Sequence, residues 1–224
     1  MGAASRGTPA EPARDCALCP RLCAYRAENR RSEPLWFNGP APSFGPEDAR
    51  LLIVGLAPGR TGANRTGRPF TGDAAGDLLY AMLARHGFSR GVYGANSADG
   101  LTLVDAMITN AVRCAPPENR PTGAEITQCR PFLAARIAAL PRLQVILALG
   151  KIAHDSVVRA LDGRLSQYVF AHAASHLPQG ATGPLLLNSY HCSRYNTNTG
   201  RLTEEMFDAV FATARQALGA PPPR

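Results

Sequence analysis

The sequence predicts a three-layer α/β fold, with helices on both faces of a central, mostly parallel four-stranded sheet. The first observation is a set of four short apolar runs: 51–56, 107–112, 145–149 and 184–190. Each run is apolar without alternation, which is typical of strands buried on both faces. The second observation is that helical patterns separate the runs, and strands that alternate with helices favour a parallel sheet.

Four helices are expected in chain order. Residues 73–87 carry apolar side chains at helical spacing, and 151–161 directly follow the third apolar run. The helix expected over 122–140 opens with Thr122 and Glu125, the pattern of a capping box. Thr203 is a further capping candidate, at the start of a helix over 203–218. The apolar side chains of that helix share one face: Met206, Phe207, Val210 and Phe211.

These elements predict one domain over 15–218. Residues 1–14 are rich in Ala, Gly, Pro, Ser and Arg without periodicity, which predicts a disordered tail, and 219–224 predict another. No apolar stretch is long enough to span a membrane, and no secretory leader follows Met1. We therefore expect a cytoplasmic monomer in a reducing compartment.

The formal net charge of +7 favours a polyanionic partner, because nucleic acids bind through neutralisation of their phosphates. Lys151 is the only lysine among the 24 basic residues, and the chain is rich in Ala, Gly and Pro. This bias also fits a GC-rich genome. Charge alone leaves both explanations open.

Polar or glycine-rich residues follow each apolar run, at 57–59, 113–114, 150–151 and 191–194. In open parallel sheets, ligands bind beyond the carboxyl ends of the strands. We therefore expect the functional site at this edge of the sheet.

Two pairs of cysteines stand far apart in the chain: Cys16 with Cys19, and Cys114 with Cys129. In a reducing compartment, clustered cysteines are more often ligands than disulfides. The four predict a metal or iron–sulfur site that ties the N-terminal segment to the body of the fold. A closed zinc site would take the same four thiolates, so spacing leaves zinc open.

Two further cysteines have less defined places. Cys23 is a competing fourth ligand or, more in keeping with its position, a buried thiol. Cys192 follows His191, and a catalytic Cys–His pair is conceivable there. Adjacent residues on a strand point in opposite directions, however, which disfavours such a pair.

A glycine-rich segment over 55–73 leaves the first strand and enters the first helix. It matches neither a P-loop nor a dinucleotide fingerprint, because no GK[ST] closes it and its glycines do not fit G-x-G-x-x-G. Phe70 offers a flat face for stacking on a base, or it is a core residue. Asp73 offers a carboxylate at the start of the helix, where a plain N-cap is the alternative.

Four segments together resemble the family 5 uracil-DNA glycosylases: 55–59, 66–73, 110–117 and 191–203. The resemblance runs from about Cys16 to Phe211. Leu56 stands where the related family 4 carries a carboxylate, which points to family 5. The resemblance implies the uracil-DNA glycosylase fold and a [4Fe-4S] cluster held by Cys16, Cys19, Cys114 and Cys129.

The resemblance also implies a monofunctional enzyme that hydrolyses the N-glycosidic bond of uracil flipped out of double-stranded DNA, leaving an abasic site. Other deaminated bases such as hypoxanthine, and single-stranded DNA, are further expected substrates. A non-catalytic binder of damaged or single-stranded DNA on the same fold is the alternative, which Leu56 keeps open. A zinc-stabilised small-molecule enzyme is a third hypothesis.

The residues suggest roles in such a reaction. Phe70 would stack on the base, and Asn110 would read its edge through an amide that both donates and accepts. His191 would donate a hydrogen bond to the departing carbonyl oxygen, and backbone amides near Gly55, Leu56 and Ala57 would add further donors. Asp73 would activate water or stabilise charge on the sugar. Asn119 is a further candidate for positioning water or base, although a loop Asn is more often a turn former.

The segment 193–201 is expected to enter DNA. Arg194 and Arg201 can meet phosphates, and Tyr195 can wedge into the gap that the flipped base leaves. An ordinary turn before the last helix is the alternative. No lysine lies in the pocket motifs, so Schiff-base lyase chemistry is not expected.

Overall fold

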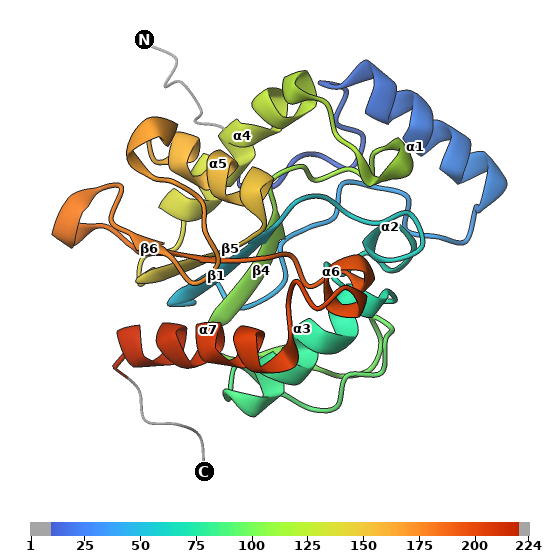
Figure 1. Ribbon diagram of the computed structural model, residues 1–224. Coiled ribbons are helices and arrows are strands. Elements are labelled where there is room, and N and C mark those ends of the chain that lie inside the picture. The colour runs from blue at the N-terminus through green and yellow to red at the C-terminus, as the bar shows by residue number, and fades with distance from the viewer. Residues whose placement is uncertain (1–9, 220–224) are drawn as a thin grey trace, which may run out of the picture.

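The computed structural model describes residues 10–219 and confirms a three-layer α/β fold (Figure 1). Four strands run parallel in the order β4-β1-β5-β7: β4 Ala106–Asn110, β1 Leu51–Gly55, β5 Val145–Leu149 and β7 Leu185–Ser189. Each predicted strand is present. The predicted number of four is corrected to five, because β6 (Ser175–His176) pairs antiparallel with β7 at the edge. This strand is too short and too polar to show as an apolar run.

Two pairs of helices cover the sheet. In Figure 1, α4 (Gly123–Ala138) and α5 (Lys151–Ala160) lie above it, and α3 (Ala74–Arg85) and α7 (Glu204–Ala217) lie below. Side chains of β1 alternate between the two layers. Leu51 and Ile53 pack in the core that includes α3 and α7, and Leu52 packs in the core that includes α4 and α5. The strands are therefore buried on both faces, which is why their sequences are continuously apolar.

The predicted helix starts are confirmed by their caps. Thr122 accepts a hydrogen bond from the Glu125 amide at 3.3 Å, and the Glu125 carboxylate accepts one from the Thr122 amide at 2.7 Å, which completes the capping box. Thr203 accepts from the Met206 amide at 3.2 Å. Both caps satisfy backbone donors that the first helical turn leaves free.

The helix α1 and several short elements were not expected from the sequence. They are α1 Pro20–Ser32, α2 Ala63–Thr66, α6 Arg194–Asn198, the hairpin of β2 Ser89–Arg90 with β3 Thr102–Leu103, and three 3-10 turns: η1 Pro117–Asn119, η2 Leu165–Gln167 and η3 Gly180–Thr182. The segment expected to be either a DNA-entering loop or a plain turn thus contains α6, a short helix capped by Ser193. Arg21 joins α1 to α4 through a bidentate ion pair with Glu125.

The described part of the predicted N-terminal tail contacts the domain. Glu11 pairs with Arg113 and Arg136, whose side chains are buried. We therefore place the start of the packed chain at Ala10 rather than at residue 15, while 1–9 and 220–224 lie outside the described residues. Within 10–219, no helix combines the length and apolar character needed to cross a membrane.

Candidate active site and cysteine centre

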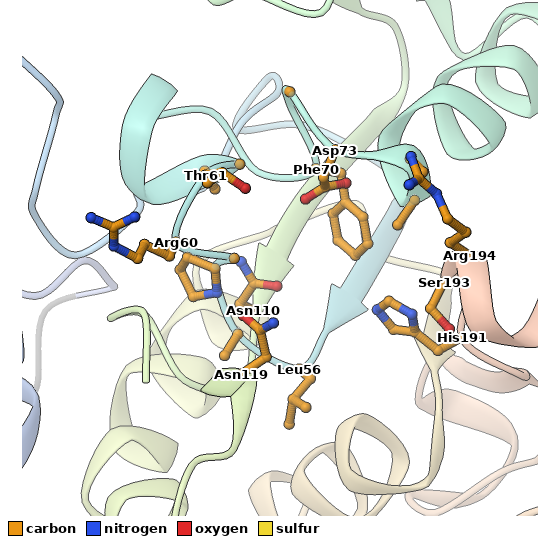
Figure 2. Close-up of a pocket in the computed structure, with 18 residues that line it drawn as sticks. Leu56, Arg60, Thr61, Phe70, Asp73, Asn110, Asn119, His191, Ser193 and Arg194 are labelled. Carbon is orange, nitrogen blue, oxygen red and sulfur yellow. The ribbon is translucent and has the colours of Figure 1, made fainter. Parts of the chain in front are cut away.

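A cavity of about 610 Å³ opens beyond the carboxyl ends of β1 and β4, the edge at which the sequence predicts the site (Figure 2). Its walls come from the glycine-rich segment, the end of β4, the loop at η1 and the segment after β7. Eight predicted site residues line it: Leu56, Ala57, Phe70, Asp73, Asn110, Asn119, His191 and Arg194. Residues far apart in the sequence thus converge on one space.

Asp73 has one carboxylate oxygen in the fold and one toward the cavity. Oδ1 accepts a hydrogen bond from the Gly76 amide at 3.0 Å and so caps α3. Oδ2 faces Gly62, where an added Cβ would lie only 2.4 Å from it. Asp73 therefore caps α3 through Oδ1, while Oδ2 lies on the side of Gly62, which lines the cavity.

Asn119 lies across Gly59 from Asp73. A Cβ built on Gly59 would be 3.5 Å from Asp73 Oδ2 and 3.9 Å from Asn119 Oδ1. Asn119 adopts a left-handed backbone (φ 56°) at the end of η1, which turns the chain toward the cavity. A glycine at position 59 keeps the space between the two polar side chains open.

Phe70 and His191 also line the cavity. Their ring centroids are 5.9 Å apart with an angle of 29° between the planes, and Figure 2 shows both rings directed inward. Burial lowers the pKa of His191, and the Asp73 carboxylate acts in the opposite direction. The imidazole is accordingly neutral at neutral pH, with one N–H to donate.

Asn110 and Gly55 form the floor. They are register partners at the ends of β4 and β1. A Cβ on Gly55 would lie 2.5 Å from Asn110 Oδ1 and 2.6 Å from Phe70 Cζ, so only glycine fits beneath these side chains. Asn110 is 2 % exposed, and its amide makes no hydrogen bond to any residue in 10–219. A polar group placed this way is available to a ligand.

Leu56 and His191 also line a neighbouring cavity of about 300 Å³, on the side of α5. The two residues therefore separate two hollows at one edge of the sheet. Arg201 lines this second cavity, and its guanidinium lies 4.7 Å from the ring centroid of Tyr190. Tyr195, on α6, is 72 % exposed and lies outside both cavities. Arg194 is the one predicted DNA contact that lines the main cavity.

A set of contacts behind Phe70 holds its backbone in the left-handed region (φ 52°). The Tyr80 hydroxyl donates to the Pro69 carbonyl at 2.9 Å, and the Tyr93 hydroxyl donates to the Phe70 carbonyl at 3.2 Å. Arg68 forms a bidentate ion pair with Asp99, both N–O distances being 2.7 Å. These positions were not predicted from the sequence. The only signal is that Arg68 falls inside the glycine-rich segment.

The Arg68–Asp99 pair is expected to stabilise the fold by a measurable amount. Both side chains are about 5 % exposed or less, so Asp99→Asn would leave a buried arginine uncompensated and lower the free energy of unfolding by about 3 kcal/mol at pH 7. Arg68 holds the pKa of Asp99 well below its ordinary value. A depressed folded pKa gives stability that is complete above about pH 4 and lost as pH falls further.

Urea unfolding at pH 7 and pH 3 measures this effect, with Asp48→Asn as the control. Asp48 pairs with Arg142 on the surface, where an ion pair contributes little. The difference in the free energy of unfolding between Asp99→Asn and the wild type should be smaller at pH 3 than at pH 7. Equal free energies of unfolding for Asp99→Asn and Asp48→Asn at pH 7 would contradict a stabilising role of the Arg68–Asp99 pair.

The four predicted ligand cysteines gather at a second place, between α1 and α4. Cys16, Cys19, Cys114 and Cys129 line one small cavity together with Cys23. Cys19 directly precedes α1, Cys129 lies on α4, and Cys114 follows β4. All six cysteines of the chain are free thiols. Within 10–219, no three His, Cys, Asp or Glu side chains stand close enough to hold a single metal ion.

The chemistry of this centre suits thiolate ligands. Burial raises the pKa of Cys19 to about 11 and that of Cys114 to about 12, so the thiols stay protonated unless a metal displaces the protons. Three N–H donors point at sulfur: Arg26 Nη1 lies 3.5 Å from Cys114 Sγ, Arg26 Nη2 lies 3.7 Å from Cys23 Sγ, and the Arg113 amide lies 3.3 Å from Cys129 Sγ. Cys23 donates to the Cys16 carbonyl at 3.3 Å, which agrees with a thiol outside the ligand set.

The fold and the cavity belong to a known class: residues 42–215 match the family model of the uracil DNA glycosylase superfamily. The chain is 45 % identical over 210 residues to a type-5 uracil-DNA glycosylase of Thermus thermophilus, covering 91 % of this chain and 94 % of the relative. It is 44 % identical to a type-5 enzyme of Mycobacterium leprae (91 % and 92 %) and 38 % identical to one of Pyrobaculum aerophilum (92 % and 90 %). The chain belongs to the type-5 uracil-DNA glycosylases.

Proposed function

We propose that this protein hydrolyses the N-glycosidic bond of uracil in double-stranded DNA and leaves an abasic site. The observation that carries the proposal is the convergence of Asp73, Asn110 and His191, from three separate segments, on one cavity beside Phe70. A glycosylase must take the target nucleotide out of the duplex and hold it in such a pocket. The named activity of the type-5 relatives supports the same reaction.

Recognition of the base rests on Phe70 and Asn110. The ring of Phe70 offers a face for stacking, and the free amide of Asn110 offers a donor and an acceptor to the edge of a pyrimidine. Gly55 beneath them leaves no side chain to compete for this space. The contacts that fix the Phe70 backbone keep the stacking face in place before the base arrives, which reduces the cost of ordering on binding.

His191 stabilises the leaving base. Bond cleavage moves negative charge onto uracil, and a neutral imidazole donates a hydrogen bond to its carbonyl oxygen. Asp73 Oδ2, beside Gly62, positions or activates the attacking water and stabilises positive charge on the sugar. Asn119, across Gly59, provides a second polar partner for that water.

The neutral state of His191 predicts a pH profile. Because burial lowers its pKa, the imidazole already lacks its second proton at pH 7, and kcat/KM should stay constant between about pH 7 and 8.5. A required imidazolium would instead make the rate fall about tenfold per pH unit in that range. The kcat/KM of His191→Ala should fall about 100-fold. His191→Gln, which keeps a neutral hydrogen-bond donor, should have a higher kcat/KM than His191→Ala.

We propose a [4Fe-4S] cluster bound by Cys16, Cys19, Cys114 and Cys129. Each cysteine of such a cluster binds a different iron, whereas a zinc ion needs four ligands around one point. The four thiols line one small cavity between α1 and α4, which supports a shared centre. When bound, the cluster supplies a structural cross-link between the N-terminal segment and the body. Hydrolysis needs no electron transfer, and the chemistry is left to the cavity residues.

Three residues in and after the segment that follows β7 are proposed to meet the DNA. Arg194 at the rim and Arg201 beside Tyr190 bind phosphates, and the exposed Tyr195 ring wedges into the stack vacated by the flipped nucleotide. We further propose a monomer that acts in the cytoplasm and accepts other deaminated bases, hypoxanthine among them.

Incubation with duplexes that carry a single uracil, hypoxanthine or xanthine, followed by alkali, tests the function. We expect strand cleavage at uracil only after alkali, because a monofunctional enzyme leaves the backbone intact. Cleavage before alkali would indicate lyase chemistry. An absence of cleavage on all three duplexes would contradict the proposed activity and leave a DNA-binding protein on this fold.

A further inference from the structure

Two apolar residues follow α1: Leu35, which is exposed, and Trp36, which is partly buried. Leu35 is 98 % exposed, the highest value among the large apolar side chains of residues 10–219. Trp36, beside it, is the only tryptophan of the chain. A single exposed leucine is ordinary on a protein surface, so its meaning depends on its neighbours.

Arg60 connects this pair to the cavity. Its guanidinium carbon lies 5.0 Å from the ring centroid of Trp36, and the residue lines the cavity. Two side chains of the α1 region fix it: Asn29 Oδ1 accepts from Arg60 Nε at 2.8 Å, and Glu33 lies 3.8 Å from Nη2. The side chain is still 39 % exposed. An arginine held on an aromatic ring offers an anion an ordered set of N–H donors.

Arg60 and Arg194 lie on opposite sides of the cavity in Figure 2. Arg194 is next to the exposed Tyr195 on α6, and Arg60 contacts the partly buried Trp36, which adjoins the exposed Leu35. The two rims thus share one composition, a guanidinium beside an apolar or aromatic group. This combination suits DNA, in which anionic phosphates alternate with apolar faces of sugars and bases.

We propose that Leu35, Trp36 and Arg60 form a second DNA contact, which holds the duplex on the far side of the flipped nucleotide from Tyr195. Arg60 binds a phosphate, and Leu35 and the indole of Trp36 pack against sugars and base edges. The inference rests on the proposed function, since it takes the cavity as the place where the nucleotide enters. A duplex that spans the opening of the cavity contacts both the Arg60 side and the Arg194 side. A flexible single strand can bind to one side without contacting the other.

The only tryptophan provides a direct probe. Protein carrying Asp73→Asn, which keeps the substrate intact, is titrated with a uracil duplex while Trp36 emission and the anisotropy of labelled DNA are both recorded. We expect Trp36 emission to change along the same binding curve as the anisotropy. Normal DNA binding with unchanged Trp36 emission would overturn the proposal.

Leu35→Ser isolates the apolar contact, with Leu177→Ser as the control. Leu177 is 46 % exposed and follows β6, which lies at the opposite end of the molecule from α1 (Figure 1). We expect Leu35→Ser to weaken duplex binding about fivefold and single-strand binding less, and the control to weaken neither. Equal affinities of the two variants for the duplex would contradict the proposal.

Arg60→Gln isolates the phosphate contact. For this variant, the plot of the logarithm of the DNA-binding constant against the logarithm of salt concentration should be less steep than for the wild type. The magnitude of the slope should fall by about 0.9, the value for one lost phosphate contact. An unchanged slope would remove Arg60 from the interface. The two proposals fail separately: uracil release with a silent Trp36 rejects the second contact alone, and a responsive Trp36 without uracil release rejects the proposed activity alone.

Discussion

Asp73→Asn is expected to lower the single-turnover rate of uracil release by about 10³-fold, the scale of lost general-base assistance. The variant keeps the shape of the side chain but removes the negative charge that Oδ2 presents to the cavity. Asn caps helices as well as Asp does, so the hydrogen bond from the Gly76 amide and the fold should persist. Affinity for a uracil duplex should be retained, because the loss concerns the chemical step.

Asp77→Asn is the matched control. Asp77 lies in the first turn of the same helix, is exposed and does not line the cavity. Its removal changes the net charge by the same amount, so any general effect on DNA binding appears in both variants. Similar rates for Asp73→Asn and Asp77→Asn would show that the Asp73 carboxylate takes no part in the reaction. Circular dichroism of each variant excludes unfolding as the cause of a slow rate.

Cys114→Ala is expected to abolish cluster binding and to destabilise the N-terminal segment. The wild type should be brown, with broad absorption near about 400 nm, as expected for iron bound by thiolates. The variant should lose this absorption and the iron, because a three-thiolate site lacks the ligand that follows β4. Amide exchange in α1 should then accelerate, since the cross-link between Cys19 and the body contributes to folding.

Two other cysteines provide controls. Cys23→Ala should keep its iron, because Cys23 donates to a backbone carbonyl, and Cys192→Ala should keep it because Cys192 is buried beside Ala75, away from the centre. Iron and acid-labile sulfide are measured in all three variants. Loss of iron in Cys23→Ala would show that Cys23 is a ligand and that one of the four proposed cysteines is not. A colourless wild type that contains zinc would contradict the cluster.

Much of the fold is predictable because it is encoded locally. The four parallel strands are short runs that cannot be solvated on either face, and the caps at Thr122 and Thr203 use the side chain of one residue and an amide three residues later. The location of the cavity is also predictable, because the carboxyl ends of adjacent parallel strands bring Gly55 and Asn110 together.

The remaining features depend on contacts between distant segments. Asp99 pairs with Arg68 across 31 positions, and Glu11 reaches Arg113 across 102, so neither partner is evident from its own neighbourhood in the sequence. The composition of residues 1–14 predicts a disordered tail, whereas Ala10 and Glu11 contact the buried side chain of Arg113. Similarly, β6 exists only because His176 and Ser175 pair with β7.

The central claim is that the cavity at the carboxyl edge of the sheet releases uracil by hydrolysis with Asp73 in its wall. The most direct measurement is the amount of free uracil released by purified protein from a duplex with one uracil, in a single turnover, for the wild type and Asp73→Asn. We expect one free uracil and one alkali-labile site per duplex for the wild type, and a rate about 10³-fold lower for the variant at equal DNA affinity. No free uracil from the wild type, or equal rates for the two proteins, would contradict it.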